Sequence, residues 1–121
     1  MTATARAKPQ RRKSQRWQDA EEMRWAIRHW AVCIGVKSPA VYFRAMQTKW
    51  ASISSGGRMT MDTSLLAVPK DLGEFVIVHE LVHLLAPNHG RVFKAFMDAY
   101  MPDWQERAAR LQACARPAVR A

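Results

Sequence analysis

The sequence predicts one α+β domain with an N-terminal helix, a small and mainly antiparallel sheet, and further helices after the sheet. Three observations lead to this expectation. Apolar residues recur at helical spacing before residue 36, two β-forming segments flank a glycine-rich turn at residues 54–57, and helical spacing returns after Pro69. A chain of 121 residues with 49% hydrophobic and 24% charged side chains can bury one core but not two. We expect a basic disordered tail at residues 1–15, a single domain at residues 16–113 and a frayed tail at residues 114–121.

An amphipathic helix is expected from about residue 16 to residue 36, because apolar residues recur there every three or four positions. Gly35 marks its end, since glycine is common directly after a helix. His29 neighbours Arg28 on the polar face and is expected to be exposed to solvent. The residues expected to face the core are Trp17, Ala20, Met23, Ile27, Trp30, Ala31 and Ile34.

Three strands and three more helices are expected after this helix. Residues 41–47 are rich in β-forming residues, and residues 49–53 and 58–62 predict a hairpin around the turn. Pro69 suits the first turn of a helix that runs to about Leu85. The last two helices are expected at residues 89–100, with Asn88 as N-cap, and at residues 103–111, with Asp103 as N-cap.

The segment His79-Glu80-Leu81-Val82-His83 predicts a metal site. Residues four apart on a helix project from the same face, so His79 and His83 can bind one ion. Imidazole suits Zn²⁺, and this spacing of two histidines and a glutamate is typical of zinc hydrolases. Glu80 is placed to take a proton from a water molecule on that ion.

A third ligand is expected from His89, six residues after His83. Pro87 ends the helix, because proline lacks an N–H and disfavours helical angles in the preceding residue, and the chain can then turn back towards the ion. Catalytic zinc sites use three protein ligands and keep a fourth position for water, whose pKa falls to about 7. In the alternative, His89 is an exposed loop residue and a carboxylate replaces it. That carboxylate would come from Asp98, Asp103 or Glu106.

The excess of basic residues lies mainly in the tail. Residues 1–16 contain six basic side chains and no acid, whereas residues 17–102 contain nine basic and eight acidic ones. Such a tail can make non-specific contacts with nucleic-acid phosphates, or it can be a disordered, solubilising segment. We expect no membrane partner and no secretory signal, because no apolar run is long enough for either. Cys33 and Cys114 form no metal-type pair and are expected to be reduced thiols in the cytoplasm.

Peptide substrate is expected to pair with a strand that borders the metal cleft. We predict the strand Arg58–Asp62 in this position; the alternative is that this strand lies inside the sheet. Tyr100 and Arg91 are candidates for stabilising the oxyanion, and the sequence favours neither.

Several segments together form a distinctive set. They are residues 49–52, the glycine-rich turn with its following strand, and residues 78–84, 88–90, 93 and 101–104. Over residues 41–110 they resemble, in order, the YgjP-like family of predicted zinc metallopeptidases, which is related to the compact zincins called minigluzincins and more distantly to SprT-type proteases. The resemblance implies a zincin-like α+β fold with a histidine-ligated zinc and Glu80 as catalytic acid and base. The ligands it implies are His79, His83 and His89.

The chain departs from the family where relatives usually have Trp-Gly-Ser-Cys-Ser. Here the segment is Trp50-Ala51-Ser52-Ile53-Ser54, so the resemblance implies no role for that strand. We expect a cytoplasmic zinc metallopeptidase that hydrolyses peptide bonds by Glu80-assisted attack of a zinc-bound water. The alternatives are a non-catalytic zinc-containing module that binds nucleic acid or protein, and a zinc hydrolase acting on a non-peptide amide.

Overall fold

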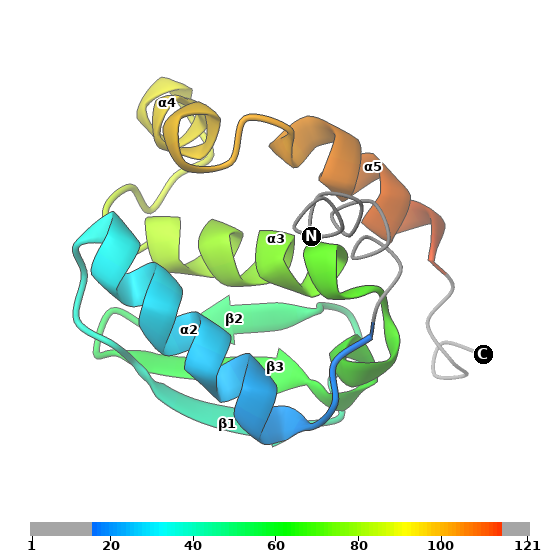
Figure 1. Cartoon of the computed structure of the whole chain (residues 1–121). Helices are drawn as coiled ribbons and strands as arrows, with labels where there is room; N and C mark the ends of the chain where they lie inside the picture. Colours follow the sequence, from blue (N-terminus) through cyan, green and yellow to red (C-terminus); the bar gives the residue numbers. More distant parts are fainter. Residues whose placement is uncertain (1–15, 115–121) are drawn as a thin grey trace, which may run out of the picture.

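The computed structural model describes residues 16–114 of the chain. The two expected tails, apart from Cys114, lie outside these residues. Figure 1 shows helices and a small sheet in the predicted order. The elements are α2 (Ala20–Ile34), β1 (Ala40–Arg44), β2 (Ala51–Ile53), β3 (Arg58–Asp62), a 3₁₀ helix η1 (Thr63–Ala67), α3 (Lys70–Val82), α4 (Arg91–Tyr100) and α5 (Trp104–Ala113).

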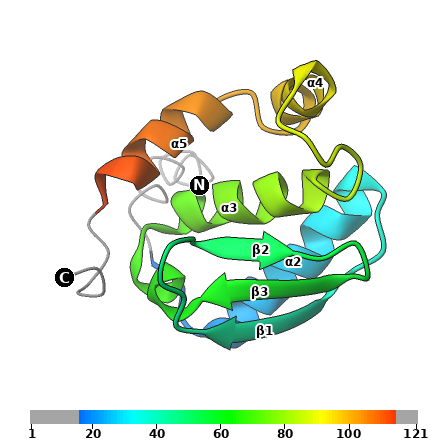
Figure 2. The same ribbon diagram turned by 180° about the vertical axis from the view of Figure 1, so that it is seen from behind.

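The sheet is mixed, whereas the sequence predicted a mainly antiparallel one. The strand order is β1-β3-β2, with β1 parallel to β3 and β2 antiparallel to β3. The hairpin of β2 and β3 is therefore confirmed. The chain leaving β1 passes the end of β3 before β2 begins, and this crossover makes β1 and β3 parallel. In Figure 2, β2 is the strand next to α3 and β3 is the central strand.

One face of the sheet is covered by helices (Figures 1 and 2). Helix α2 begins at Ala20, later than the predicted residue 16. Most of its predicted apolar stripe is buried, whereas Ala20 and Trp30 are only half-buried. The buried residues are Met23, Ile27, Ala31 and Ile34. Alternate strand residues point towards this core, so Met59 and Met61 of β3 are fully buried. The opposite face of the sheet has no helix over it in the described part of the chain. Strand β1, at one edge of the sheet, alternates exposed and half-buried residues.

The central element is α3, which is apolar on nearly every side. Gly73 allows the ring of Trp17 to lie directly on this helix: a Cβ at position 73 would be only 2.5 Å from Nε1 of that indole. Trp17 itself is buried, as predicted. The buried residues of α3 are Leu72, Gly73, Phe75, Val76, Ile77, Val78, Leu81 and Val82.

Two arginines of α5 hold this helix against the start of α3. Arg110 donates to both oxygens of the Asp71 carboxylate, at 2.7 and 3.3 Å, and Arg107 donates to the Asp71 carbonyl at 3.1 Å. The hydrogen bond to Asp71 raises the pKa of Arg110. Asp103 precedes α5 as predicted, but its carboxylate accepts from the Arg107 side chain and caps no backbone N–H.

The remaining predictions concern exposure and the cysteines. His29 is exposed on α2 as expected. Cys33 and Cys114 are free thiols. Among the described residues, every helix is too short or too polar to cross a bilayer.

Candidate metal centre

The metal-site helix ends earlier than predicted, at Val82 instead of about Leu85. His83 is its C-cap and keeps nearly helical angles, with φ −61° and ψ −20°. Its N–H donates to the carbonyl of Glu80 at 3.1 Å, so the last turn tightens without changing direction. His79 and His83 consequently stay on one face, and their ring centroids are 4.9 Å apart.

The chain after His83 turns back, as the proline predicted. The N–H groups of Leu85 and Ala86 both donate to the Val82 carbonyl, at 2.8 and 2.9 Å, which closes a compact turn before Pro87. This turn brings the His89 ring to 4.6 Å from the His83 ring. The next helix begins at Arg91 with Gly90 as N-cap, so the predicted cap at Asn88 is wrong. After Pro87, residues 88–90 are not helical, and the helix begins at Arg91.

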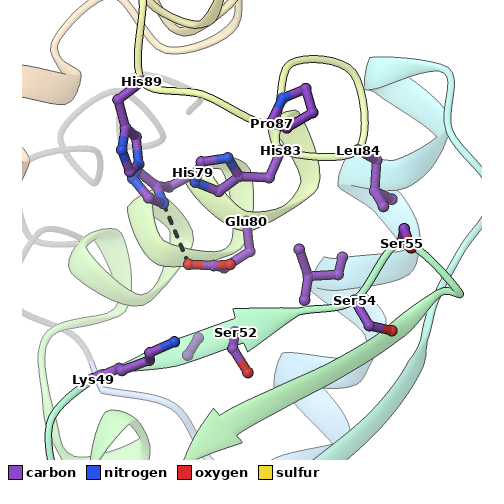
Figure 3. A pocket seen from close by; sticks show the side chains of 12 residues that line it. Lys49, Ser52, Ser54, Ser55, His79, Glu80, His83, Leu84, Pro87 and His89 are labelled. Carbon is purple, nitrogen blue, oxygen red and sulfur yellow. Dashed lines mark hydrogen bonds and ion pairs between the residues drawn. The ribbon is translucent and has the colours of Figure 1, made fainter.

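His79, His83 and His89 form a group that we call the histidine cluster. One ring nitrogen from each lies within 4.8 Å of the others (Figure 3). Imidazole nitrogens are preferred ligands of Zn²⁺, and three of them leave the fourth tetrahedral position open. The donor set therefore fits a catalytic zinc ion.

The carboxylates considered as alternative ligands are engaged elsewhere. Asp98 accepts a hydrogen bond from Nε1 of Trp104 at 2.7 Å. Asp103 pairs with Arg107 at 3.0 Å, and Glu106 lies 3.7 Å from Arg110. None of the three belongs to the group of residues that could hold an ion.

Phe93 of α4 contacts all three rings of the histidine cluster. Its ring centroid lies 5.1 Å from His79, 4.8 Å from His83 and 4.9 Å from His89. The side chain is 2% exposed, so the rings rest on a packed wall. Sequence reasoning gave this residue no role at the site. The sequence did contain one signal for such a role: Phe93 lies four residues after His89, on the next helix.

The hydrogen bonds of two histidines select one tautomer. Nδ1 of His83 lies 3.3 Å from the Ala86 carbonyl and Nδ1 of His79 lies 3.3 Å from Oε2 of Glu80. Both partners can only accept, so Nδ1 donates and Nε2 is left with its lone pair for an ion. Burial, and then the nearby His79, lower the pKa of His83, which favours the neutral form that binds metal.

Glu80 points from α3 towards β2, as Figure 3 shows. Its side chain is 12% exposed, and the exposed part faces a cavity of about 590 Å³. We call this space the metal cavity, because the histidine cluster and Glu80 line one side of it. Its other side is formed by Lys49, β2 and the following residues Ser54 and Ser55.

The prediction about the strand at the cavity wall is wrong. The strand at its edge is β2, not Arg58–Asp62, because β3 is paired on both sides and lies inside the sheet. Tyr100 and Arg91, the candidates for stabilising an oxyanion, do not line the cavity. The Tyr100 hydroxyl instead donates to the Ile34 carbonyl at 3.4 Å.

Comparison with known proteins identifies a family for this chain and solved structures with a similar fold. Residues 2–113 match the YgjP-like, metallopeptidase domain family. The fold is similar to that of the metallopeptidase zymogen abylysin of Pyrococcus abyssi, with a TM-score of 0.68 and 23% identity over 74% of this chain and 91% of that one. It is also similar to the metallopeptidase zymogen jannalysin of Methanocaldococcus jannaschii, with a TM-score of 0.66 and 18% identity over 74% and 93% of the two chains. No curated protein sequence matches significantly.

Proposed function

The chain belongs to the YgjP-like metallopeptidase family, and we propose that it is a zinc-dependent peptidase. The histidine cluster holds the ion, and Glu80 is the general base. The convergence of three ring nitrogens beside a carboxylate that faces an open cavity is the observation that supports this proposal most directly. A purely structural zinc site would have a fourth protein ligand in place of the open position.

A zinc ion in this site would polarise the scissile carbonyl and lower the pKa of a water molecule. Glu80 accepts the proton of the attacking water on its carboxylate and passes it to the nitrogen of the leaving amine. The hydrogen bond from His79 orients this carboxylate before substrate arrives. Burial lowers the pKa of His83, which favours its neutral form, and Phe93 packs against all three rings.

Substrate is bound as an extended peptide along the free edge of β2. Within residues 16–114 this strand pairs with β3 alone, so its second edge offers backbone groups for hydrogen bonds. The same strand lines the metal cavity opposite Glu80. An added peptide strand would be held by its main chain, with its carbonyls presented to the metal cavity.

The test is hydrolysis of a peptide library by metal-free protein reloaded with one equivalent of zinc. Cleavage that depends on zinc and stops with a chelator is the expected result. Zinc binding without cleavage, by wild type and Glu80→Gln protein alike, would contradict the proposal and favour a non-catalytic module.

A further inference from the structure

A second cavity adjoins the metal cavity at the start of β2. It has a volume of about 330 Å³ and is lined by residues 44–49 and Ser52. We call it the crossover cavity, because residues 45–49 are the segment that passes the end of β3 between β1 and β2. Lys49 and Ser52 line both cavities, so the two spaces are neighbours.

The lining of the crossover cavity is basic. Among residues 16–114, Arg44 and Lys49 are the ionisable side chains that line it. The guanidinium of Arg44 has no hydrogen-bond or ion-pair partner within residues 16–114. Asp62 is the register partner of Arg44, but its buried carboxylate accepts from the Met46 N–H and the Ser64 hydroxyl and does not line the cavity.

The crossover cavity lies where a substrate strand would place alternate side chains. Successive side chains of an extended peptide point to opposite faces of the sheet it joins. On β2, Ala51 points into the core, whereas Figure 3 shows the Ser52 hydroxyl on the side of the strand away from Glu80. A peptide on this edge would therefore direct some side chains to the metal cavity and others to the crossover cavity.

We propose that the crossover cavity is a substrate subsite for an acidic side chain, aspartate or glutamate, with Arg44 as its cationic group. This inference rests on the proposed peptidase function, because it assumes a peptide along β2. Selectivity of this kind arises when main-chain pairing provides affinity and pockets for alternate side chains provide specificity.

The experiment measures peptide binding separately from cleavage. Zinc-loaded Glu80→Gln protein is titrated into labelled peptides of one uncharged sequence, each with a single aspartate at a successive position, and into the matching asparagine peptides. At one position, aspartate should strengthen binding about two- to fivefold, the range of an exposed ion pair. Salt should reduce this gain.

Substitutions of Arg44 test whether this residue causes the preference for aspartate. Arg44→Glu should reverse the preference, so that lysine at that position binds better than aspartate, and Arg44→Gln should abolish it. Arg58→Glu is the matched control, because Arg58 is an exposed sheet arginine that stacks on Tyr42 at 4.6 Å and lines neither cavity. This variant should keep the aspartate preference.

The two proposals fail in different ways. If no position prefers aspartate to asparagine, or if Arg44→Glu keeps the preference, the acidic subsite is wrong. Absence of cleavage by the wild type, with the Arg44-dependent preference intact, would contradict the peptidase function and support the subsite as a binding site.

Discussion

The ring of Phe93 stacks on the imidazole of His83, with centroids 4.8 Å apart and an interplanar angle of 29°. His83 caps the end of α3 and Phe93 lies in α4, so the contact couples the packing of α4 to the geometry of the histidine cluster. It also covers the ring whose pKa is lowered by burial.

Replacing Phe93 with leucine should weaken zinc binding about tenfold, because the three imidazole rings would lose the aromatic ring against which they all pack. Groups that orient metal ligands affect affinity by this order of magnitude. Competition with a zinc-chelating dye measures the effect. Phe96→Leu is the matched control: Phe96 is a partly buried residue of the same helix that stacks on Tyr100 and not on the cluster. Equal affinities of the two variants would contradict a positioning role for Phe93.

Glu80→Gln should reduce kcat by about 10²–10⁴-fold, the usual contribution of general acid–base catalysis. Glutamine is nearly isosteric but cannot accept and return a proton. Zinc content should remain at one equivalent, since Glu80 is outside the histidine cluster. Turnover close to that of the wild type would rule out Glu80 as the base.

His89→Ala should lose stoichiometric zinc after dialysis, because only two imidazoles would remain. Elemental analysis of the dialysed protein measures the loss. His29→Ala is the control, since His29 is exposed on α2 and lies outside the cluster. Full zinc retention by His89→Ala would show that another group is the third ligand.

The metal-free protein should lose stability as the pH falls below 6.5, the ordinary pKa of histidine. The pKa of His83 is lower in the folded state, mainly because the ring is buried. The unfolded chain therefore binds more protons in this range, and the free energy of unfolding decreases as pH decreases. Denaturant unfolding at several pH values should show a shallower dependence for His83→Asn. Identical slopes would mean that His83 titrates equally in both states.

Gly73→Ala should destabilise the fold by about 1–3 kcal/mol, the usual cost of overpacking a core. The new Cβ would lie within 2.9 Å of three atoms of the Trp17 ring. Gly56→Ala is the control, because its nearest neighbour, Oγ of Ser54, would be 3.8 Å away. Denaturant unfolding compares the two variants, and similar midpoints would show that Trp17 moves aside without cost.

The sequence by itself determined the structural features that depend only on residues close together in the chain. Helical geometry places His79 and His83 on one face whatever surrounds the helix, and the backbone restriction at Pro87 makes the chain turn before His89. The hairpin of β2 and β3 likewise follows from its glycine turn and the β-forming segments beside it.

Only the tertiary structure decided which strand borders the metal cavity and which residues support the cluster. The order of the strands depends on the crossover of residues 45–49 past β3, and no local pattern encodes that path. The contact of Phe93 with the histidine rings depends on how α4 docks against α3, and the presence of Arg44 and Ser52 in the lining of one cavity depends on the order β1-β3-β2. Such contacts join residues far apart in the chain, so their energies appear only when the core is packed.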